Sequence, residues 1–208
     1  TILVTILALL IGVILGVVVA VIRTGHDQQR KGKHNPVLAV LNLICKIYVT
    51  VIRGTPMLVQ LMIMGFVVFQ NSRNFTMVGA LALGINSGAY VAEIIRGGLM
   101  SLDPGQMEAG RSLGLGYLPT MTFIVVPQAF KAILPALGNE FITLLKDTSL
   151  ISAIAGKEVV YFAKAIGAKT YDYMFPLLII AVMYLILVLI FTWLQGILER
   201  RLRASDRR

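Results

Sequence analysis

The chain has 208 residues, of which 57% are hydrophobic and only 14% charged, and its mean hydropathy is +0.83. A water-soluble domain of this size would need more charge to cover its surface, so this composition excludes a soluble globular protein. Several apolar runs approach the length of about 20 residues that crosses a bilayer as a helix. The runs are continuous, whereas a closed β-barrel needs short alternating segments. We therefore expect one all-α integral membrane domain over residues 1–208, embedded in a lipid bilayer.

The net charge of +9 would suggest a nucleic-acid partner on a soluble protein. In a membrane protein it indicates orientation instead, because Lys and Arg concentrate in cytoplasmic loops, and we expect no nucleic-acid partner. The first apolar stretch, 2–22, is longer than a signal-peptide core and follows no basic residue, so it is taken as a retained span. The loop 23–35 is predicted to be cytoplasmic, which makes the first span run from outside to inside. Its basic residues are Arg23, Arg30, Lys31 and Lys33, with His26 and His34 beside them.

The next region leaves two alternatives open. Residues 36–53 are apolar but contain Lys46, and Arg53-Gly54-Thr55-Pro56 then breaks or kinks the helix. Either each half crosses the membrane, or 36–53 lies along the inner interface and 56–70 completes a single crossing. The tail 199–208 carries five Arg and should be cytoplasmic, which favours the single crossing. The predicted spans are 2–22, 56–70, 76–95, 132–155 and 174–198, with the N-terminus outside and the C-terminus inside.

A polar helix is predicted over 104–115, in the cytoplasmic region between the third and fourth spans. Asp103 is a good N-cap and Pro104 a good first helical residue, and Pro119 is expected to end the helix. The sequence alone also allows an interfacial helix that merely packs on the bundle. Glu108, Arg111 and Leu115 can line one face, whereas Ala109, Gly110 and Gly114 offer a small, closely approachable surface.

This segment resembles a family motif. Glu108-Ala109-Gly110, three residues, Gly114, nine residues and then Ile124-Val125-Val126-Pro127 is similar to the EAA loop of permease subunits of bacterial ABC importers. The match departs from that pattern at Gly110, where the family has Ala, and at Val126, where it has Leu. Three further segments resemble the branch that imports polar amino acids. They are Arg53-Gly54-Thr55-Pro56, Tyr90-Val91-Ala92-Glu93-Ile94-Ile95-Arg96-Gly97-Gly98 and Lys146-Asp147-Thr148-Ser149-Leu150.

The resemblance implies a type I ABC importer permease fold, with five transmembrane helices and a cytoplasmic coupling helix that docks on an ATPase subunit. It also implies two such ATPases, a second permease chain, expected to be identical, and an extracytoplasmic amino-acid-binding protein. The chain has no G-x-x-x-x-G-K-[ST] phosphate loop, so we expect it to be a transport subunit and no enzyme. ATP and Mg²⁺ would then be bound by the partner ATPase, and no cofactor or metal by this chain.

Ionisable residues inside spans are costly and by default mark functional sites. Glu140, Thr143 and Asp147 share one helical face by their spacing. We expect a substrate site there, and a carboxylate favours arginine, lysine or histidine over a glutamine- or glutamate-type substrate. A self-satisfied polar network and a secondary amino acid transporter remain alternatives, and Glu93 with Arg96 is read as a structural pair. The other residues predicted to line the site are Asn139, Asn86, Tyr90, Gln60 and Met57.

Overall fold

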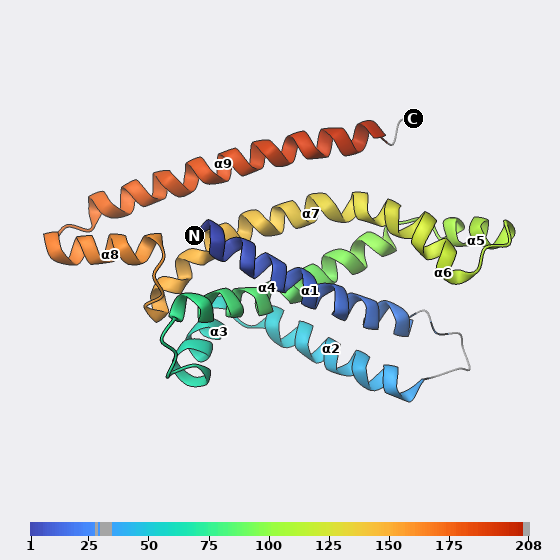
Figure 1. The fold of residues 1–208 in the computed structure, drawn as a ribbon, viewed down its shortest axis with the longest axis horizontal. Coiled ribbons are helices and arrows are strands. Elements are labelled where there is room, and N and C mark those ends of the chain that lie inside the picture. The colour runs from blue at the N-terminus through green and yellow to red at the C-terminus, as the bar shows by residue number, and fades with distance from the viewer. Residues whose placement is uncertain (28, 30–34, 206–208) are drawn as a thin grey trace.

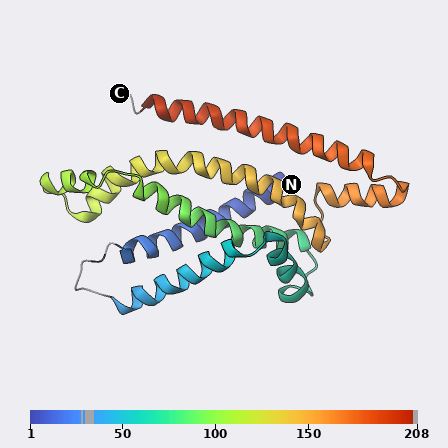
Figure 2. The same cartoon turned by 180° about the vertical axis from the view of Figure 1, so that it is seen from behind.

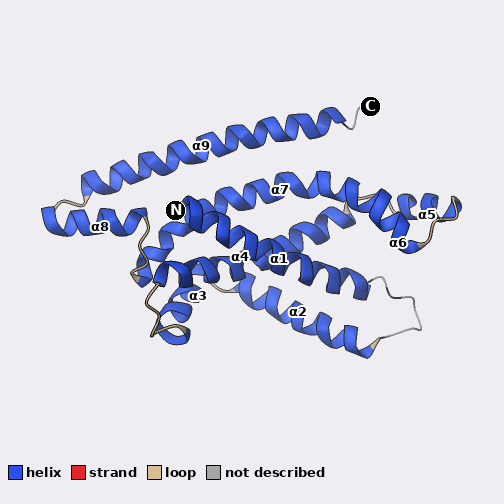
Figure 3. Ribbon diagram, in the orientation of Figure 1, coloured by secondary structure: helices blue, strands red, loops and turns tan. Residues whose placement is uncertain are grey.

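The computed structural model describes residues 1–27, 29 and 35–205, and all regular structure in this part of the chain is helical (Figure 3). Five helical stretches are long and apolar enough to cross a membrane, as predicted. Part of the basic loop and of the tail lies outside the described residues, namely Arg30, Lys31, Lys33, His34, Arg207 and Arg208. The elements are α1 (Ile2–Asp27), α2 (Pro36–Gly54), α3 (Met57–Ile63), η1 (Met64–Val68), α4 (Phe75–Met100), α5 (Gly105–Ser112), α6 (Tyr117–Thr120), η2 (Met121–Val125), α7 (Val126–Asp147), η3 (Thr148–Ile154), α8 (Val159–Thr170) and α9 (Met174–Ser205).

Helices α1 and α4 cross closely at the centre of the bundle (Figures 1 and 2). Glycines four residues apart line the contact on both helices: Gly12 and Gly16 on α1, Gly84 and Gly88 on α4. A Cβ added at Gly12 would lie 2.8 Å from the Ser87 hydroxyl, so the helices touch backbone to side chain. Such small-residue repeats are how membrane helices approach without a hydrophobic driving force. Because of this contact, Ser87 has a fixed position in the middle of the bundle.

The second crossing differs from the prediction, which assigned it to 56–70. Only α2 has the length of a span, whereas 57–68 forms the shorter α3 and the π-helical η1. Twelve helical residues rise about 18 Å, which is less than the hydrocarbon thickness. The Tyr48 hydroxyl near the end of α2 donates to the Ile85 carbonyl in the middle of α4, at 2.5 Å. Gly65 in η1 packs on Ile154. Therefore α2 and α3 follow α4 in series, as one broken helix.

The remaining spans are longer than expected. The third is α4, and the fourth is a continuous helix from Tyr117 to Ile154 that includes α6, η2, α7 and η3. The segment 156–173, between the fourth and fifth predicted spans, contains α8. Helix α9 lies along the flank of the molecule (Figure 1) and packs on α7 through an edge-to-face contact of Phe141 with Phe191, at a centroid distance of 4.8 Å. Most of the apolar surface of α9 is exposed within the single chain.

Candidate functional site

The centre of the bundle holds a carboxylate that is fixed by a hydroxyl group. The Ser87 Oγ of α4 donates a hydrogen bond to Glu140 Oε1 of α7, at 2.7 Å. Ser87 is fully buried and Glu140 is half-buried. Sequence reasoning predicted Glu140 but missed Ser87. The available signal was the position of Ser87 between Gly84 and Gly88, on a helix whose neighbours come unusually close.

A second polar link joins α3 to α4 beside this pair. Asn86 Nδ2 donates to Gln60 Oε1 at 2.9 Å, so two predicted site residues do meet. Gln60 Nε2 also donates to the Ile52 carbonyl at 2.7 Å and to Thr55 Oγ1 at 2.7 Å. In a continuous helix the residue at position 56 would satisfy the Ile52 carbonyl, but Pro56 has no N–H. Gln60 therefore holds the helix break together, as well as facing the site.

A cation lies next to these groups. The Arg53 guanidinium stands over the Tyr90 ring, with its carbon 5.3 Å from the ring centroid. Both side chains are exposed within the single chain. Tyr90 was predicted to line the site, whereas Arg53 was not, because 36–53 was expected along the inner interface. In the broken second crossing, the last turn of α2 carries Arg53 to Tyr90 on α4.

The other predicted residues of α7 and α3 contribute less directly. The Thr143 hydroxyl donates to the Asn139 carbonyl at 3.1 Å, and Asn139 Oδ1 accepts from Gln195 of α9 at 3.0 Å. Asn139 thus holds α9 and does not meet Asn86 or Gln60. Asp147 is the half-buried last residue of α7. Met57 packs against the apolar core at the start of α3 and supplies no polar group.

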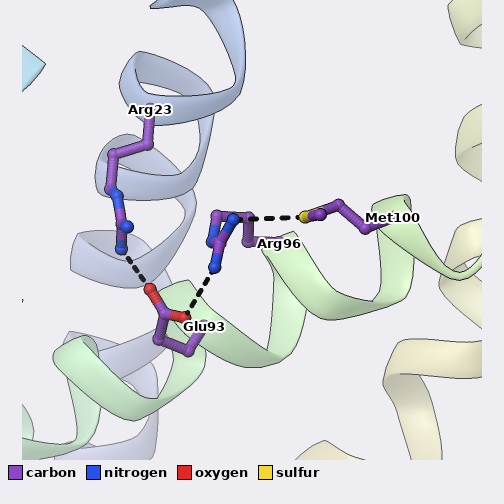
Figure 4. A network of polar contacts seen from close by, with 4 residues as sticks. All are labelled: Arg23, Glu93, Arg96 and Met100. Atoms are coloured by element: carbon purple, nitrogen blue, oxygen red, sulfur yellow. Dashed lines mark hydrogen bonds and ion pairs between the residues drawn. The ribbon is translucent and has the colours of Figure 1, made fainter. Parts of the chain in front are cut away.

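The pair of Glu93 and Arg96 is part of a larger ion-pair network near the end of α4 (Figure 4). Arg23 of α1 contacts Glu93 Oε1, and Arg96 Nη2 lies 3.3 Å from Glu93 Oε2. Arg96 also points at the Met100 sulfur, at 3.1 Å. The predicted pairing is present, and Arg23 extends it into a network that fastens α1 to α4. Within the described residues, no group of three His, Cys, Asp or Glu side chains is arranged to hold a metal ion.

The polar helix predicted over 104–115 is α5, at the far end of α4 from α3 (Figure 1). Asp103 Oδ1 accepts from the Gly105 N–H at 2.8 Å, as an N-cap at this position would. The helix itself begins one residue later than predicted, with Pro104 at the N-cap position. Glu108, Ala109 and Arg111 are exposed, whereas Gly110 is buried. A Cβ at Gly110 would lie 2.5 Å from Thr120 of α6.

Gly114 ends this helix, and Pro119, which was expected to do so, lies within α6. Gly114 has a left-handed backbone with φ of +78°. The Leu115 N–H donates to the Gly110 carbonyl at 3.0 Å and the Gly114 N–H to the Arg111 carbonyl at 2.9 Å. This is the Schellman arrangement, which needs glycine because other residues rarely adopt a positive φ. The result is a short, firmly ended helix that presents Glu108 and Arg111 to solvent.

The chain is similar in sequence to a family of membrane transport proteins. Residues 36–204 match the family model described as binding-protein-dependent transport system inner membrane component. The chain is 40% identical over 187 residues to the arginine transport system permease protein ArtQ of Bacillus subtilis, which covers 82% of this chain and 84% of that protein. It is 38% identical over 168 residues to the putative glutamine transport system permease protein GlnP of Rickettsia bellii, with 79% and 77% covered.

Solved structures show the same fold. A crystal structure of an amino acid ABC transporter with histidines is similar at a TM-score of 0.85 and 41% sequence identity, covering 97% of this chain and 90% of that chain. An inward-facing form of the MetNI methionine ABC transporter gives a TM-score of 0.76 at 19% identity, with 97% and 92% covered. At that identity the second likeness concerns the fold alone.

Proposed function

Because the chain belongs to the family of binding-protein-dependent transport system inner membrane components, we propose that it forms the translocation pathway of an importer for basic amino acids. The chain is a membrane-spanning permease subunit and not the ATPase. Its relatives include permeases named for arginine and for glutamine, both of them polar amino acids. Membership of this family excludes the alternative of a secondary transporter, since transport by this family is driven by a separate ATPase.

The observation that carries the choice of a basic substrate is the Glu140 carboxylate. It sits half-buried in the middle of α7, and Ser87 supplies its one hydrogen bond among the described residues. Carboxylates inside a membrane bundle are costly unless a cation or several donors offset the charge. A guanidinium, ammonium or imidazolium group of the substrate would supply that cation. A glutamine-type substrate stays the second candidate, because the amides of Gln60 and Asn86 meet beside the carboxylate.

The energy would enter through α5. We propose that its exposed face, with Glu108, Ala109 and Arg111, docks on a cytoplasmic ATPase and that Gly110, Gly114 and Leu115 hold the helix in place. Two ATPases, each binding ATP and Mg²⁺, would act on a pair of identical permease chains that alternate between outward- and inward-facing states. An extracytoplasmic binding protein would deliver the amino acid. The N-terminus would then lie outside and the C-terminus in the cytoplasm, in line with the basic tail.

The test is uptake of arginine and of glutamine by the complex in proteoliposomes, with Glu140→Gln compared against Glu140→Asp. Loss of one charged hydrogen-bonded pair costs about 1.5 to 3 kcal/mol, so arginine uptake at low concentration should fall at least about tenfold in Glu140→Gln. Glu140→Asp keeps the charge and should retain part of the uptake. Assembly with the ATPase should be unchanged in both. Unaltered arginine uptake by Glu140→Gln would dispose of the basic-substrate proposal.

A further inference from the structure

The Arg53 side chain is a charge for which the described part of the chain provides no anion. Arg53 forms no ion pair in that part, where Glu93 pairs with Arg23 and Arg96, and Asp27 with His26. Its contact is with the face of the Tyr90 ring. An aromatic face steadies a guanidinium without using its N–H donors, which lie in the plane of the guanidinium itself. Arg53 is therefore held in one place with its donors available.

The position of Arg53 places those donors beside the candidate substrate site. On α4, at 100° per residue, Tyr90 points about 40° from Asn86 and about 60° from Ser87. Tyr90 thus faces the gap between the α2–α3 break, which Asn86 contacts, and α7, which Ser87 contacts. Tyr90 also follows Ser87 by about 4.5 Å along the helix axis. The guanidinium over its ring is consequently a near neighbour of the Ser87–Glu140 pair, toward the α5 end of α4.

A guanidinium and a carboxylate on neighbouring elements match the two ends of an amino acid. A planar guanidinium binds a carboxylate through two parallel N–H···O bonds, and an unpaired charge in a membrane bundle requires a counter-ion. We propose that Arg53 binds the α-carboxylate of the transported amino acid, with Tyr90 fixing the plane of the guanidinium. This proposal rests on the proposed function, and it assigns the two ends of the substrate to two residues. Arg53 binds the α-carboxylate that all amino acids share, and Glu140 binds the positively charged side chain that only basic amino acids carry.

Lys146 is the other cation near the site, and it fits this role less well. It follows Glu140 by six residues, which turns it about 120° away from the side of α7 that Glu140 occupies. It is also adjacent in sequence to Asp147, whose carboxylate offsets its charge. Its ammonium is a point charge without the planar fork that pairs with a carboxylate. The geometry therefore favours Arg53 as the carboxylate partner.

The experiment measures equilibrium binding to the purified complex of the permease and its ATPase, with two probes. One is L-arginine, and the other is agmatine, which is L-arginine without its carboxylate. Arg53→Gln should weaken L-arginine binding at least about tenfold and leave agmatine binding unchanged, because only one probe carries the group that Arg53 recognises. Arg53→Lys keeps the charge without the planar fork, so its affinity for L-arginine should lie between those of the wild type and Arg53→Gln. Lys46→Gln removes a charge from an exposed position of the same helix and serves as the matched control.

Two results would overturn the assignment: unchanged L-arginine binding in Arg53→Gln, or equal losses for L-arginine and agmatine. The second result would show that Arg53 only shapes the site. Failure of the proposed function gives a different pattern, since the unaltered complex would then bind L-glutamine in preference to L-arginine. In that case the same comparison is made with L-glutamine and 4-aminobutanamide, its decarboxylated form. Selective loss of L-glutamine in Arg53→Gln would still support the carboxylate role.

Discussion

The left-handed turn at Gly114 gives the sharpest test of how the polar helix works. A Cβ at this position meets no atom within 4 Å, so a substitution there acts through the backbone and not through a clash. Gly114→Val adds a branched side chain to a residue with φ of +78°, whereas Gly114→Asn adds the side chain that best tolerates this conformation. The two variants should therefore separate backbone strain from the mere presence of a side chain.

The size of the effect follows from the geometry. A non-glycine residue in the left-handed region costs about 1 to 2 kcal/mol, with β-branched residues at the upper end. If the turn opens instead, the hydrogen bonds from Leu115 to Gly110 and from Gly114 to Arg111 are lost, at about 1 kcal/mol each. Either route disfavours the docked helix by a factor of about 5 to 30. The spanning helices do not share these bonds, so the membrane domain should stay folded.

The assay is the number of amino acid molecules imported per ATP hydrolysed by the complex in proteoliposomes. We expect the number imported per ATP to decrease from the wild type to Gly114→Asn and further to Gly114→Val. The valine variant should hydrolyse ATP without a matching import of amino acid. Gly116→Val is the matched control in the same loop, because Gly116 has φ of −68° and a Cβ there meets only Pro119 Cδ, at an ordinary contact distance of 3.8 Å. The reasoning fails if Gly114→Val couples like the wild type, or if Gly116→Val is equally defective.

Two further predictions concern stability. Gly16→Ala places a Cβ 2.5 Å from Val91 and should cost about 1 to 3 kcal/mol in thermal unfolding of the purified chain, whereas Gly25→Ala, with no neighbour within 4 Å, should be neutral or slightly stabilising. Equal effects of the two would contradict the close α1–α4 contact. Burial raises the pKa of the Glu158 carboxyl above its ordinary value of 4.5, against hydrogen bonds from Val160 and Tyr184. The folded state therefore binds that proton more tightly than the unfolded state, so this contribution to stability is full below about pH 4.5 and is lost as pH rises through the folded pKa. Glu158→Gln should flatten the pH dependence of the unfolding midpoint. A variant with the same pH profile as the wild type would refute the role given to Glu158.

The amino-acid sequence was enough to predict the helical membrane domain, because hydropathy over about 20 residues reports directly on what lipid can accept. It was also enough for the existence and the start of the polar helix, since Asp103 and Pro104 are local signals. Its end was misplaced, because Pro119 was expected to end it and the left-handed Gly114 does so. The second crossing was harder. The break at Pro56 was visible, but no local signal shows that a side chain eight residues after Ile52 repairs it. Hence 56–70 was taken as a whole span where the chain instead uses two helices in series.

Glu140 could be named from the sequence alone, since a carboxylate in an apolar stretch is conspicuous. Its partner could not, because Ser87 lies 53 residues earlier and is an ordinary residue in an apolar helix. The glycines of α1 and α4 decide that Ser87 sits in the centre, and only the packed bundle shows that Arg53 stands over Tyr90. Composition and periodicity fix which segments enter the membrane, since each residue contributes to the hydropathy of its segment independently of residues far away in the chain. Which polar groups meet there depends on helix crossings, and those are set by contacts between residues far apart in the chain.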